Sequence, residues 1–454
     1  MFGGIMTAIK KRIGLNEHFD CKKMLRFAVP SVIMMIFTSV YSIVDGVFIS
    51  NFVGDTAFTG LNLIFPVLII LGSVGMMFGS GGSAILSRLL GEGKQQLANR
   101  YFSLFLIAIV AVAVVFGCLG FAYMDVFAHW LGGQNATAEA IEAATLYGRT
   151  FIIGLPFCML QYSFQSFFIT AEKSKLGFIV TVVAGVTNAV LDAVFILGFS
   201  LGLAGAALAT VAGQVIGGVV PIVYFLRKND SLLRLARPKF SLKTLLTACA
   251  NGSSELLTNI SSSVVSILYN LILLSIAGND GVIAYGVIMY MSTVFMGIFY
   301  GFSMGVAPII GYHYGAKNSD ELKGLLRRGL LITAVTGLVL FALSEALAVP
   351  FASVFSNTDR VKELTQYGIL LYSVSYLLMG INVFGSAFFT ALGAGGASAL
   401  ISFLRTFLFQ CGSVLLLSFL YGITGVWLAI VLAEGLSLVV TVLLFKGMRK
   451  KYGY

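Results

Sequence analysis

Long runs of apolar residues recur along this 454-residue chain from Ala28 to Phe445. Charged residues make up only 11% of the chain and hydrophobic residues 58%, whereas an ordinary soluble domain has about 25% charged residues. A run of roughly 20 apolar residues is long enough to cross the hydrocarbon core of a bilayer as a helix. The sequence therefore predicts an all-α integral membrane protein with many spans, and it excludes a soluble enzyme.

The apolar runs predict twelve transmembrane helices and two lobes. The predicted helices lie at 27–51, 58–86, 101–122, 147–171, 176–198, 203–226, 253–277, 282–310, 329–348, 366–391, 399–420 and 422–445. We expect a cytoplasmic linker at 227–252 between an N-terminal lobe, 1–226, which includes a cytoplasmic tail, and a C-terminal lobe, 253–454. A Leu-Leu-x-x-Leu pattern flanked by basic residues in this linker leaves open a short amphipathic helix on the membrane surface.

Basic residues indicate how the chain crosses the membrane. The sequence has 29 Lys and Arg against 19 Asp and Glu, a formal net charge of +10. If the N-terminus is cytoplasmic, 25 of the 29 fall on the cytoplasmic side, which is the positive-inside pattern. We therefore expect both termini in the cytoplasm, and we expect the basic residues to face a lipid bilayer and not a nucleic acid.

Cofactor and metal signatures are missing from the sequence. The five cysteines are scattered without a CxxC pair, and there are only three histidines, so neither a disulfide framework nor a zinc site is indicated. Motifs such as HExxH, GxSxG and Walker A are also absent from the sequence, which disfavours a membrane-embedded enzyme. We expect no cofactor.

The two halves of the chain are copies of one design. At a spacing of 220, residues 145–226 align without a gap with 365–446 and share 20 identities, where composition alone gives about 7. At a spacing of 224, Gly54, Gly81 and Gly91 fall on glycines. Each copy has six helices, so both have the same orientation and are related by a pseudo-twofold axis along the membrane normal. This arrangement favours a transporter with its pathway between the lobes.

Polar residues inside the predicted spans of the N-terminal lobe form one group. Asp45, Asp192 and Thr210 all lie roughly 10 Å from the outer membrane surface at 1.5 Å per helical residue, and Asn188 is one turn from Asp192 on the same face. Carboxylate, amide and hydroxyl oxygens can bind Na⁺. Two buried carboxyls can instead retain a proton. Both alternatives are ion-coupling mechanisms, and a purely structural hydrogen-bonding role for these residues is less favoured.

The C-terminal lobe has no such group at the aligned positions. Leu408, Gly412 and Ile430 stand where the N-terminal lobe has Asn188, Asp192 and Thr210 at the spacing of 220, so an ion site of this type belongs to the N-terminal lobe.

The C-terminal lobe has polar residues of its own within its spans. Glu434 lies near the middle of the last span, and Arg405 lies in the inner half of the preceding one. An internal ion pair and a Glu434 that lines a cavity are both open. Glu255, near the inner end of the predicted helix 253–277, faces either the lipid headgroups or a central cavity.

These residues resemble the multidrug and toxic compound extrusion (MATE) family, especially its bacterial multidrug-efflux branch. The resemblance covers essentially the whole chain. It is carried by VDGVFISNFVG at 44–54, AGVTNAVLDAVFILGFSLGLAGAALAT at 184–210, NGSSELLTNISSS at 251–263, and the turns LLGEGK and YHYGAK.

The resemblance implies alternating access in a bacterial plasma membrane, with small-molecule drugs or toxins, often cationic and amphiphilic, exported in exchange for H⁺ or Na⁺. It also implies that the N-lobe residues Asp45, Asn188, Asp192 and Thr210, with Gln165 as a further polar partner, bind the proton or a possible Na⁺. Glu255, Glu434 and Arg405 are possible cavity or substrate residues. We expect a monomer.

Two other transporter classes are compatible with twelve helices. A flippase for lipid-linked precursors belongs to the same broader superfamily, but such proteins tend to have a strongly cationic cavity, and Arg405 is the single basic residue we place well inside the membrane here. A major-facilitator antiporter also has six plus six helices. However, the SRLLGEGKQQ connection before the predicted helix 101–122 lacks the acidic-basic signature expected in that class.

Overall fold

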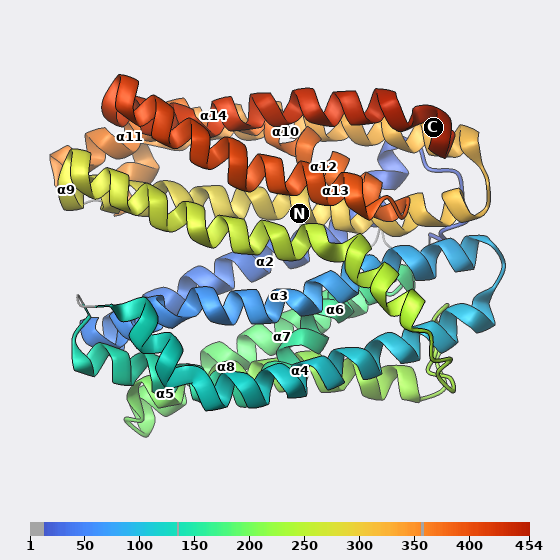
Figure 1. The fold of residues 1–454 in the computed structure, drawn as a ribbon, viewed down its shortest axis with the longest axis horizontal. Coiled ribbons are helices and arrows are strands. Elements are labelled where there is room, and N and C mark those ends of the chain that lie inside the picture. Colours follow the sequence, from blue (N-terminus) through green and yellow to red (C-terminus); the bar gives the residue numbers. More distant parts are fainter. Residues whose placement is uncertain (1–12, 134–135, 356–357) are drawn as a thin grey trace.

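A computed structural model describes residues 13–133, 136–355 and 358–454, nearly all of them helical. The predicted N-terminal tail, 1–12, lies outside the described residues. The helices form two lobes, one above the other in Figure 1. The N-terminal lobe contains α2 (Cys21–Phe52), α3 (Asp55–Gly91), α4 (Gln95–Gly132), α5 (Ala138–Ile153), α6 (Leu155–Thr170), α7 (Ser174–Asp192), the π-helical turn η1 (Ala193–Gly198) and α8 (Gly202–Leu226). The C-terminal lobe contains α9 (Leu242–Gly315), α10 (Ser319–Phe355), α11 (Asp359–Ser373), α12 (Tyr376–Ala391), α13 (Gly395–Phe403), the π-helical turn η2 (Leu404–Phe409) and α14 (Gln410–Tyr452).

The prediction of twelve membrane passes is confirmed for the described helices. Eight helical stretches are long and apolar enough to span a bilayer, and two bent pairs add a span each. Two of the eight stretches pass twice, because α9 and α14 double back at Gly278 (φ 63°, ψ −155°) and Gly422 (φ 58°, ψ −133°). Glycine has no Cβ and adopts this positive φ readily. The chain is a multi-pass membrane protein.

The bent pairs are a feature that the predicted spans 147–171 and 366–391 do not contain. Helices α5 and α6 meet at 62°, and α11 and α12 meet at 53°. At the first bend, Pro156 follows Gly154 at the start of α6. Proline cannot donate the backbone hydrogen bond that a continuous helix needs there, so the helix restarts in a new direction.

Backbone geometry repeats between the two lobes. Gly54 (φ 104°) and Gly278 (φ 63°) are 224 residues apart, and Gly202 (φ 54°) and Gly422 (φ 58°) are 220 apart. All four form tight turns between successive spans. Helices turn at equivalent points in both copies, so the repeat found in the sequence is also a repeat in the fold.

An ungapped alignment at 220 is wrong by one residue at one turn. The Lys173 amide donates to the Phe168 carbonyl, and the matching bond runs from Ala394 to Phe389. These pairs are 221 residues apart, as are the starts of α6 and α12 and the starts of α7 and α13. Residues around this turn therefore correspond at a spacing of 221 and not at the spacing of 220 that the ungapped alignment uses.

The molecule has two different ends. We call the end with the C-terminus and the connection 227–241 the basic end, at the right of Figure 1. The opposite end contains the turns at Gly54, Gly202, Gly278 and Gly422. Among the described residues, most of the Lys and Arg that the positive-inside pattern assigns to the cytoplasm lie at the basic end.

The lobes meet at the basic end through direct contact of helix backbones. A methyl group added at Gly252 of α9 would lie 1.9 Å from the Met77 carbonyl oxygen of α3, and one added at Gly81 would lie 2.0 Å from the Ala248 carbonyl oxygen. At the end of α3, a methyl on Gly91 would lie 2.0 Å from a carbonyl of α9. Only glycine allows helices to approach this closely, so the glycines determine how the lobes pack.

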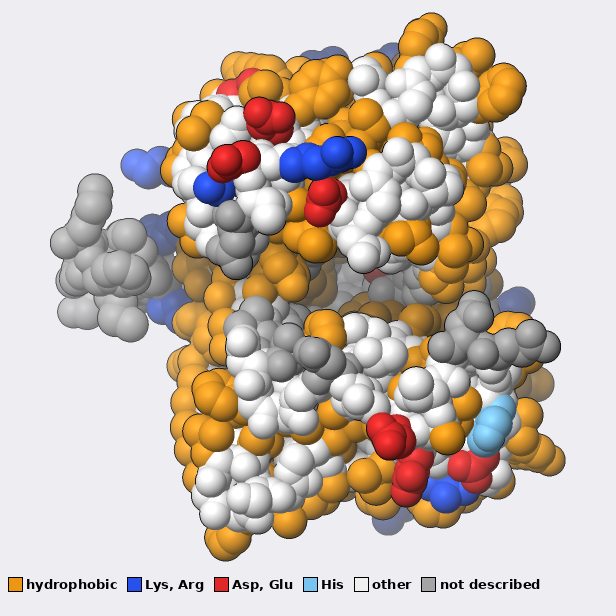
Figure 2. Space-filling model, turned by 90° about the vertical axis from the view of Figure 1, so that its left-hand side faces the viewer, with side chains coloured by type: hydrophobic (Ala, Val, Ile, Leu, Met, Phe, Trp, Pro, Cys, Tyr) orange, Lys and Arg blue, Asp and Glu red, His pale blue; other side chains and the backbone are white. Residues whose placement is uncertain are grey.

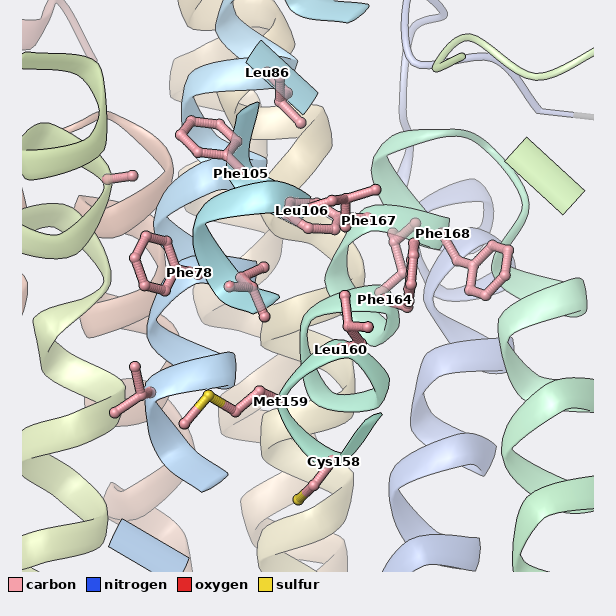
Figure 3. Close-up of a cluster of buried hydrophobic side chains, with 14 of the residues drawn as sticks. Phe78, Leu86, Phe105, Leu106, Cys158, Met159, Leu160, Phe164, Phe167 and Phe168 are labelled. Carbon is pink, nitrogen blue, oxygen red and sulfur yellow. The ribbon is translucent and has the colours of Figure 1, made fainter. Parts of the chain in front are cut away.

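Apolar packing follows the same division. One buried cluster runs through the N-terminal lobe and includes C-lobe side chains at the basic end, such as Phe388; Figure 3 shows an N-lobe part of it, where α3, α4 and α6 pack together. The C-terminal lobe has a second cluster around Trp427. Seen from the opposite end, the molecule is hollowed between its two halves (Figure 2). The lobes are joined at the basic end and separated at the other.

Residues 13–19, which we call the N-terminal strap, connect the two lobes at the basic end. The Leu15 amide donates to Glu172 of the N-terminal lobe at 2.8 Å. The Phe19 amide donates to Glu321 of the C-terminal lobe at 3.0 Å, and Arg328 donates to the Phe19 carbonyl. Leu15 and Phe19 are buried, so the strap is part of the packed structure.

The connection between the lobes differs in part from its prediction. Residues 229–241 are not helical, so the proposed amphipathic helix does not form there. Residues 242–252 belong to the first turns of α9. The non-helical part packs on the N-terminal lobe, where the amides of Arg234 and Ala236 donate to Asn99 and Ser103 of α4.

The glycine contact between the lobes gives a first prediction. Gly252→Ala places a methyl group against the backbone of α3, and we expect it to lower the free energy of unfolding by about 1 to 3 kcal/mol through overpacking. Thermal unfolding in detergent measures this. Gly435→Ala is the matched control, since no atom lies within 4 Å of the added methyl. Equal melting temperatures for the two variants would contradict the interpretation of a tight backbone contact.

Candidate ion and substrate site

Packing of α2 against α7 brings the two predicted carboxyls together. Gly185 of α7 admits the rings of Phe37 and Tyr41 of α2, and a methyl group there would lie 2.7 Å from the Phe37 ring. Asp45 follows Tyr41 by one turn, and Asp192 follows Gly185 by two. The side chains of Asp45 and Asp192 lie close enough to interact electrostatically. Two adjacent carboxyls can share a proton, with the protonated one donating to the other.

Asn188 and Thr210 complete the group that the sequence predicts. The Asn188 amide nitrogen donates to Thr210 Oγ1 at 3.3 Å, and Thr210 Oγ1 donates to the Ala206 carbonyl at 3.0 Å. Asn188 and Asp192 are each 1% exposed. Because the amide nitrogen of Asn188 points at Thr210, the side-chain carbonyl oxygen of Asn188 points away from Thr210.

Several oxygens of this group have no hydrogen-bond donor in the part of the chain that the structure describes. They are Asp45 Oδ1, Asn188 Oδ1 and Asp192 Oδ1, all buried, and Gln214 Oε1 on α8 is another. A buried acceptor without a donor costs about 1 to 3 kcal/mol. A set of acceptors without donors in one lobe is suited to bind a positive charge, either a proton or a hard cation.

Sequence reasoning missed three residues near this group. Tyr147 of α5 lies near Thr210, Tyr41 lies within electrostatic range of both carboxyls, and Gln214 is one turn from Thr210 on α8. Gln214 could have been found from the sequence, because it is a polar residue inside an apolar span and lies one helical turn from Thr210. Tyr147 comes from a helix whose orientation depends on the bend at Gly154, and no local pattern gives that orientation.

A cavity lies between the lobes, on the basic side of the hollow. Its walls come from α2, α3, α6, α9, α12, α13 and η2. The lining residues are Met35, Met76, Ser80, Ser83, Ala84, Tyr162, Gln165, Ser166, Glu255, Thr258, Tyr300, Ser303, Met304, Ala307, Val383, Ser386, Ala387, Thr390, Ala391, Ser402 and Arg405. Methionines, tyrosines and small hydroxyl side chains predominate, which suits a wall that adapts to different apolar molecules.

Gln165 and Glu255 both line this cavity. Among the described residues Gln165 makes no hydrogen bond to Asp45 or Asp192, and its side chain lies in the cavity wall. Glu255 is half-buried in the cavity wall, which decides between the two positions that the sequence left open for it.

Arg405 and Glu434 form an internal ion pair. The Arg405 Nε donates to Glu434 Oε1 at 2.7 Å, with both side chains buried. Asn382 donates to Glu434 Oε2 at 2.7 Å, and Thr441 donates to Asn382 at 3.0 Å. Arg405 lines the cavity and Glu434 lies behind it. The charge of Arg405 is therefore balanced within the wall, and Glu255 is the charged lining residue without a described ion-pair partner.

Comparison with known proteins identifies the family. The MatE family model matches residues 30–194 and 256–415. The chain belongs to the MatE family. The matched segments include Asp45, Asn188, Asp192 and Arg405, and they cover both lobes of the repeat.

Relatives of this MatE chain share its full length. It is 26% identical over 438 residues to the multidrug export protein MepA of Staphylococcus saprophyticus, covering 95% of this chain and 94% of that protein. It is 24% identical over 440 residues to MepA of Staphylococcus aureus, with the same coverage.

Solved structures of MATE transporters share the fold. A crystal structure of MATE in complex with MaL6 superposes with a TM-score of 0.90 at 21% identity, covering 96% of this chain and 98% of that one. An outward-facing conformation of a multidrug resistance MATE family transporter superposes with a TM-score of 0.89 at 21% identity, covering 96% and 97%. The two-lobe fold expected from the sequence is confirmed.

The buried ion pair of this MatE protein gives a second prediction. Arg405→Met leaves Glu434 buried without its cation, and we expect a loss of about 3 to 5 kcal/mol in the free energy of unfolding. The double variant Arg405→Met/Glu434→Gln removes both charges and retains the Asn382 bond, so most of that loss is recovered. Thermal unfolding measures both. Arg360→Met, at an exposed pair with Asp280 of 3.5 Å, is the control and changes stability by less than about 1 kcal/mol. A double variant as unstable as the single one would overturn this account.

Proposed function

We propose that this protein is a secondary active multidrug antiporter that exports amphiphilic, cationic organic compounds in exchange for H⁺ or Na⁺. Relatives that match it over almost their whole length are multidrug export proteins. The observation that carries the proposal is the N-lobe group in which buried oxygens of Asp45, Asn188 and Asp192 have no donor among the described residues. The protein acts as a transporter and not as an enzyme.

Ion coupling in this proposal uses the carboxyl pair as a two-state element. With one shared proton, Asp45 and Asp192 stay together and hold α2 against α7. Without it, two adjacent carboxylates repel each other, unless Na⁺ takes the proton's place with Asn188 and Thr210 as further oxygen ligands. Ion binding and release thereby change the packing of α2, which also contributes Met35 to the cavity wall.

Cation selectivity in this proposal rests on the cavity charge. The Arg405 charge is balanced by Glu434, and Glu255 remains as an anionic group in a wall of methionine, tyrosine and hydroxyl side chains. A cation with an apolar body satisfies both parts of this surface. The flippase alternative requires a strongly cationic cavity, and the paired Arg405 gives it no support.

Alternating access explains the unequal ends of the molecule. We propose that the basic end, which includes the end of α14 and the N-terminal strap, faces the cytoplasm of a bacterial cell. The hollow in Figure 2 then faces outward. Transport then alternates between this state and one in which the lobes part at the basic end. All site residues come from one chain, so we propose that a monomer is the working unit.

The third prediction concerns the carboxyl pair. Asp45→Asn and Asp192→Asn remove a carboxyl from the shared-proton pair, and we expect gradient-driven export to fall to the level of vesicles without protein. Efflux of a fluorescent cation from proteoliposomes, with Na⁺ and pH gradients imposed separately, measures both activity and coupling ion. Asp320→Asn, the same change at a side chain that is 98% exposed, keeps wild-type export. Export by Asp45→Asn at the wild-type rate would overturn this mechanism.

The fourth prediction concerns the substrate. Glu255→Gln removes the remaining anionic group from the cavity, and we expect the Kd for a cationic compound to rise roughly tenfold while that for a neutral compound of similar shape stays within about twofold. Binding by fluorescence polarisation in detergent distinguishes the two ligands. Equal losses for the cationic and the neutral compound would show that Glu255 acts through packing and not through its charge.

A further inference from the structure

An apolar groove lies on the C-terminal lobe between α10 and α14, at the basic end. Its floor is formed by Leu326 and Leu330 of α10 and by Phe445 of α14. The surface of the groove is almost entirely apolar. Both helices leave the membrane at this end, so the groove lies where hydrocarbon meets the headgroup layer.

Four basic residues border this groove. They are Lys323 and Arg327 on α10, and Lys446 and Arg449 on α14. The groove surface contains almost no polar atoms, so these side chains contribute their aliphatic stems to it and have their charged groups at its edge. Long basic side chains at the end of a membrane helix commonly take this arrangement.

Two of the four cations are uncompensated. Lys323 approaches Asp320 at 3.5 Å, and Arg449 donates to the main-chain oxygen of Tyr454 at 3.2 Å. Within residues 13–133, 136–355 and 358–454, neither Arg327 nor Lys446 has an ion pair, and both are exposed. The groove therefore combines an apolar floor with positive charge that no neighbouring protein group neutralises.

The internal repeat supplies an independent observation. The equivalent groove of the N-terminal lobe lies between α4 and α8, and the chain itself fills it. At the spacing of 224, Lys323 and Arg327 correspond to Asn99 and Ser103. In the N-terminal lobe those two side chains accept the amides of the linker, from Arg234 and Ala236, at 2.9 Å each.

The linker also covers the apolar floor of that N-lobe groove. Leu233 is fully buried, and the Leu235 amide donates to the Phe225 carbonyl of α8. Phe225 corresponds to Phe445 at the spacing of 220. Apolar groups thus occupy the N-lobe groove, with polar side chains at its edge holding the main chain in place.

We propose that an anionic phospholipid of the surrounding bilayer binds in the groove between α10 and α14. Its phosphate pairs with Arg327 and Lys446, and an acyl chain lies along Leu326, Leu330 and Phe445. The C-lobe groove has cations where the N-lobe groove has two acceptors for the linker. Tyr454 packs on Phe445 at one side of the C-lobe groove and leaves Arg327 and Lys446 exposed, so this edge is suited to an anionic group. Basic pockets between membrane helices on the cytoplasmic side recognise such headgroups. The proposal does not depend on the coupling ion or on the exported compound.

Native mass spectrometry of the full-length protein tests this site. The protein is mixed in detergent with equal amounts of dioleoyl phosphatidylglycerol and dioleoyl phosphatidylcholine, and the ratio of the two lipids that remain bound is measured. We expect wild type to retain phosphatidylglycerol preferentially. In Arg327→Gln/Lys446→Gln this ratio falls on the order of tenfold, because the two cations that pair with the lipid phosphate in the groove are lost.

Matched controls separate this site from general charge attraction and from simple phosphate binding. Lys22→Gln/Arg26→Gln removes the same two charges from exposed positions of α2 at the basic end and leaves the ratio within about twofold of wild type. Leu330→Trp fills the floor with all charges intact and also lowers the ratio.

Three outcomes would overturn the proposal. The first is a ratio for Arg327→Gln/Lys446→Gln equal to that of wild type or of the α2 control. The second is a Leu330→Trp variant with unchanged preference. The third is displacement of phosphatidylglycerol by millimolar inorganic phosphate, which would make the site one for a soluble anion.

Discussion

Backbone contact between α3 and α9 determines the arrangement of both lobes. At Gly81 and Gly252 the helices approach until a single methyl group would collide with a carbonyl oxygen of the partner. Between membrane helices no hydrophobic effect drives association, and close packing of small residues takes its place. The glycine contacts lie at the basic end, so the shared apolar cluster, the strap and the inter-lobe cavity are all arranged around a joint at that end, and the other end is left apart.

The two lobes use the same backbone but distribute polar groups differently. Among the described residues, oxygens of Asp45, Asn188 and Asp192 in the N-terminal lobe have no donor, whereas in the C-terminal lobe Glu434 is bound by both Arg405 and Asn382. An ion that binds and leaves requires the first kind of chemistry. A rigid wall requires the second, because a paired and hydrogen-bonded charge has no reason to exchange its partner. In the proposed mechanism, the duplicated fold thereby has one lobe that responds to the ion and one that stays fixed.

Much of this architecture follows from patterns that are local in the sequence. Apolar run length predicts the twelve passes, and helical spacing places Asn188 one turn from Asp192. The sequence predicted that Asp45 lies near that pair only because all three residues have a similar depth in the membrane. In the structure the approach depends on Gly185, which leaves room for the aromatic rings of α2. What the sequence could not supply are effects that depend on bends. The direction of α5 and α6 at Gly154 decides that Gln165 faces the cavity and that Tyr147 reaches Thr210. The spacing of 221 between the starts of α6 and α12 is likewise invisible in an ungapped alignment, because identities at a spacing of 220 conceal it.

The N-terminal strap sets a limit on how far the lobes can move apart. Its two anchors, the amides of Leu15 and Phe19, belong to different lobes through Glu172 and Glu321. Four residue steps of fully extended chain measure at most about 14 Å. While both anchors hold, the strap is a tether of that length across the basic end. Any wider opening requires one carboxylate to release its amide. If that carboxylate is Glu321 and it moves away with its lobe, His18, which pairs with Glu321 at 2.6 Å, loses its partner in the same step.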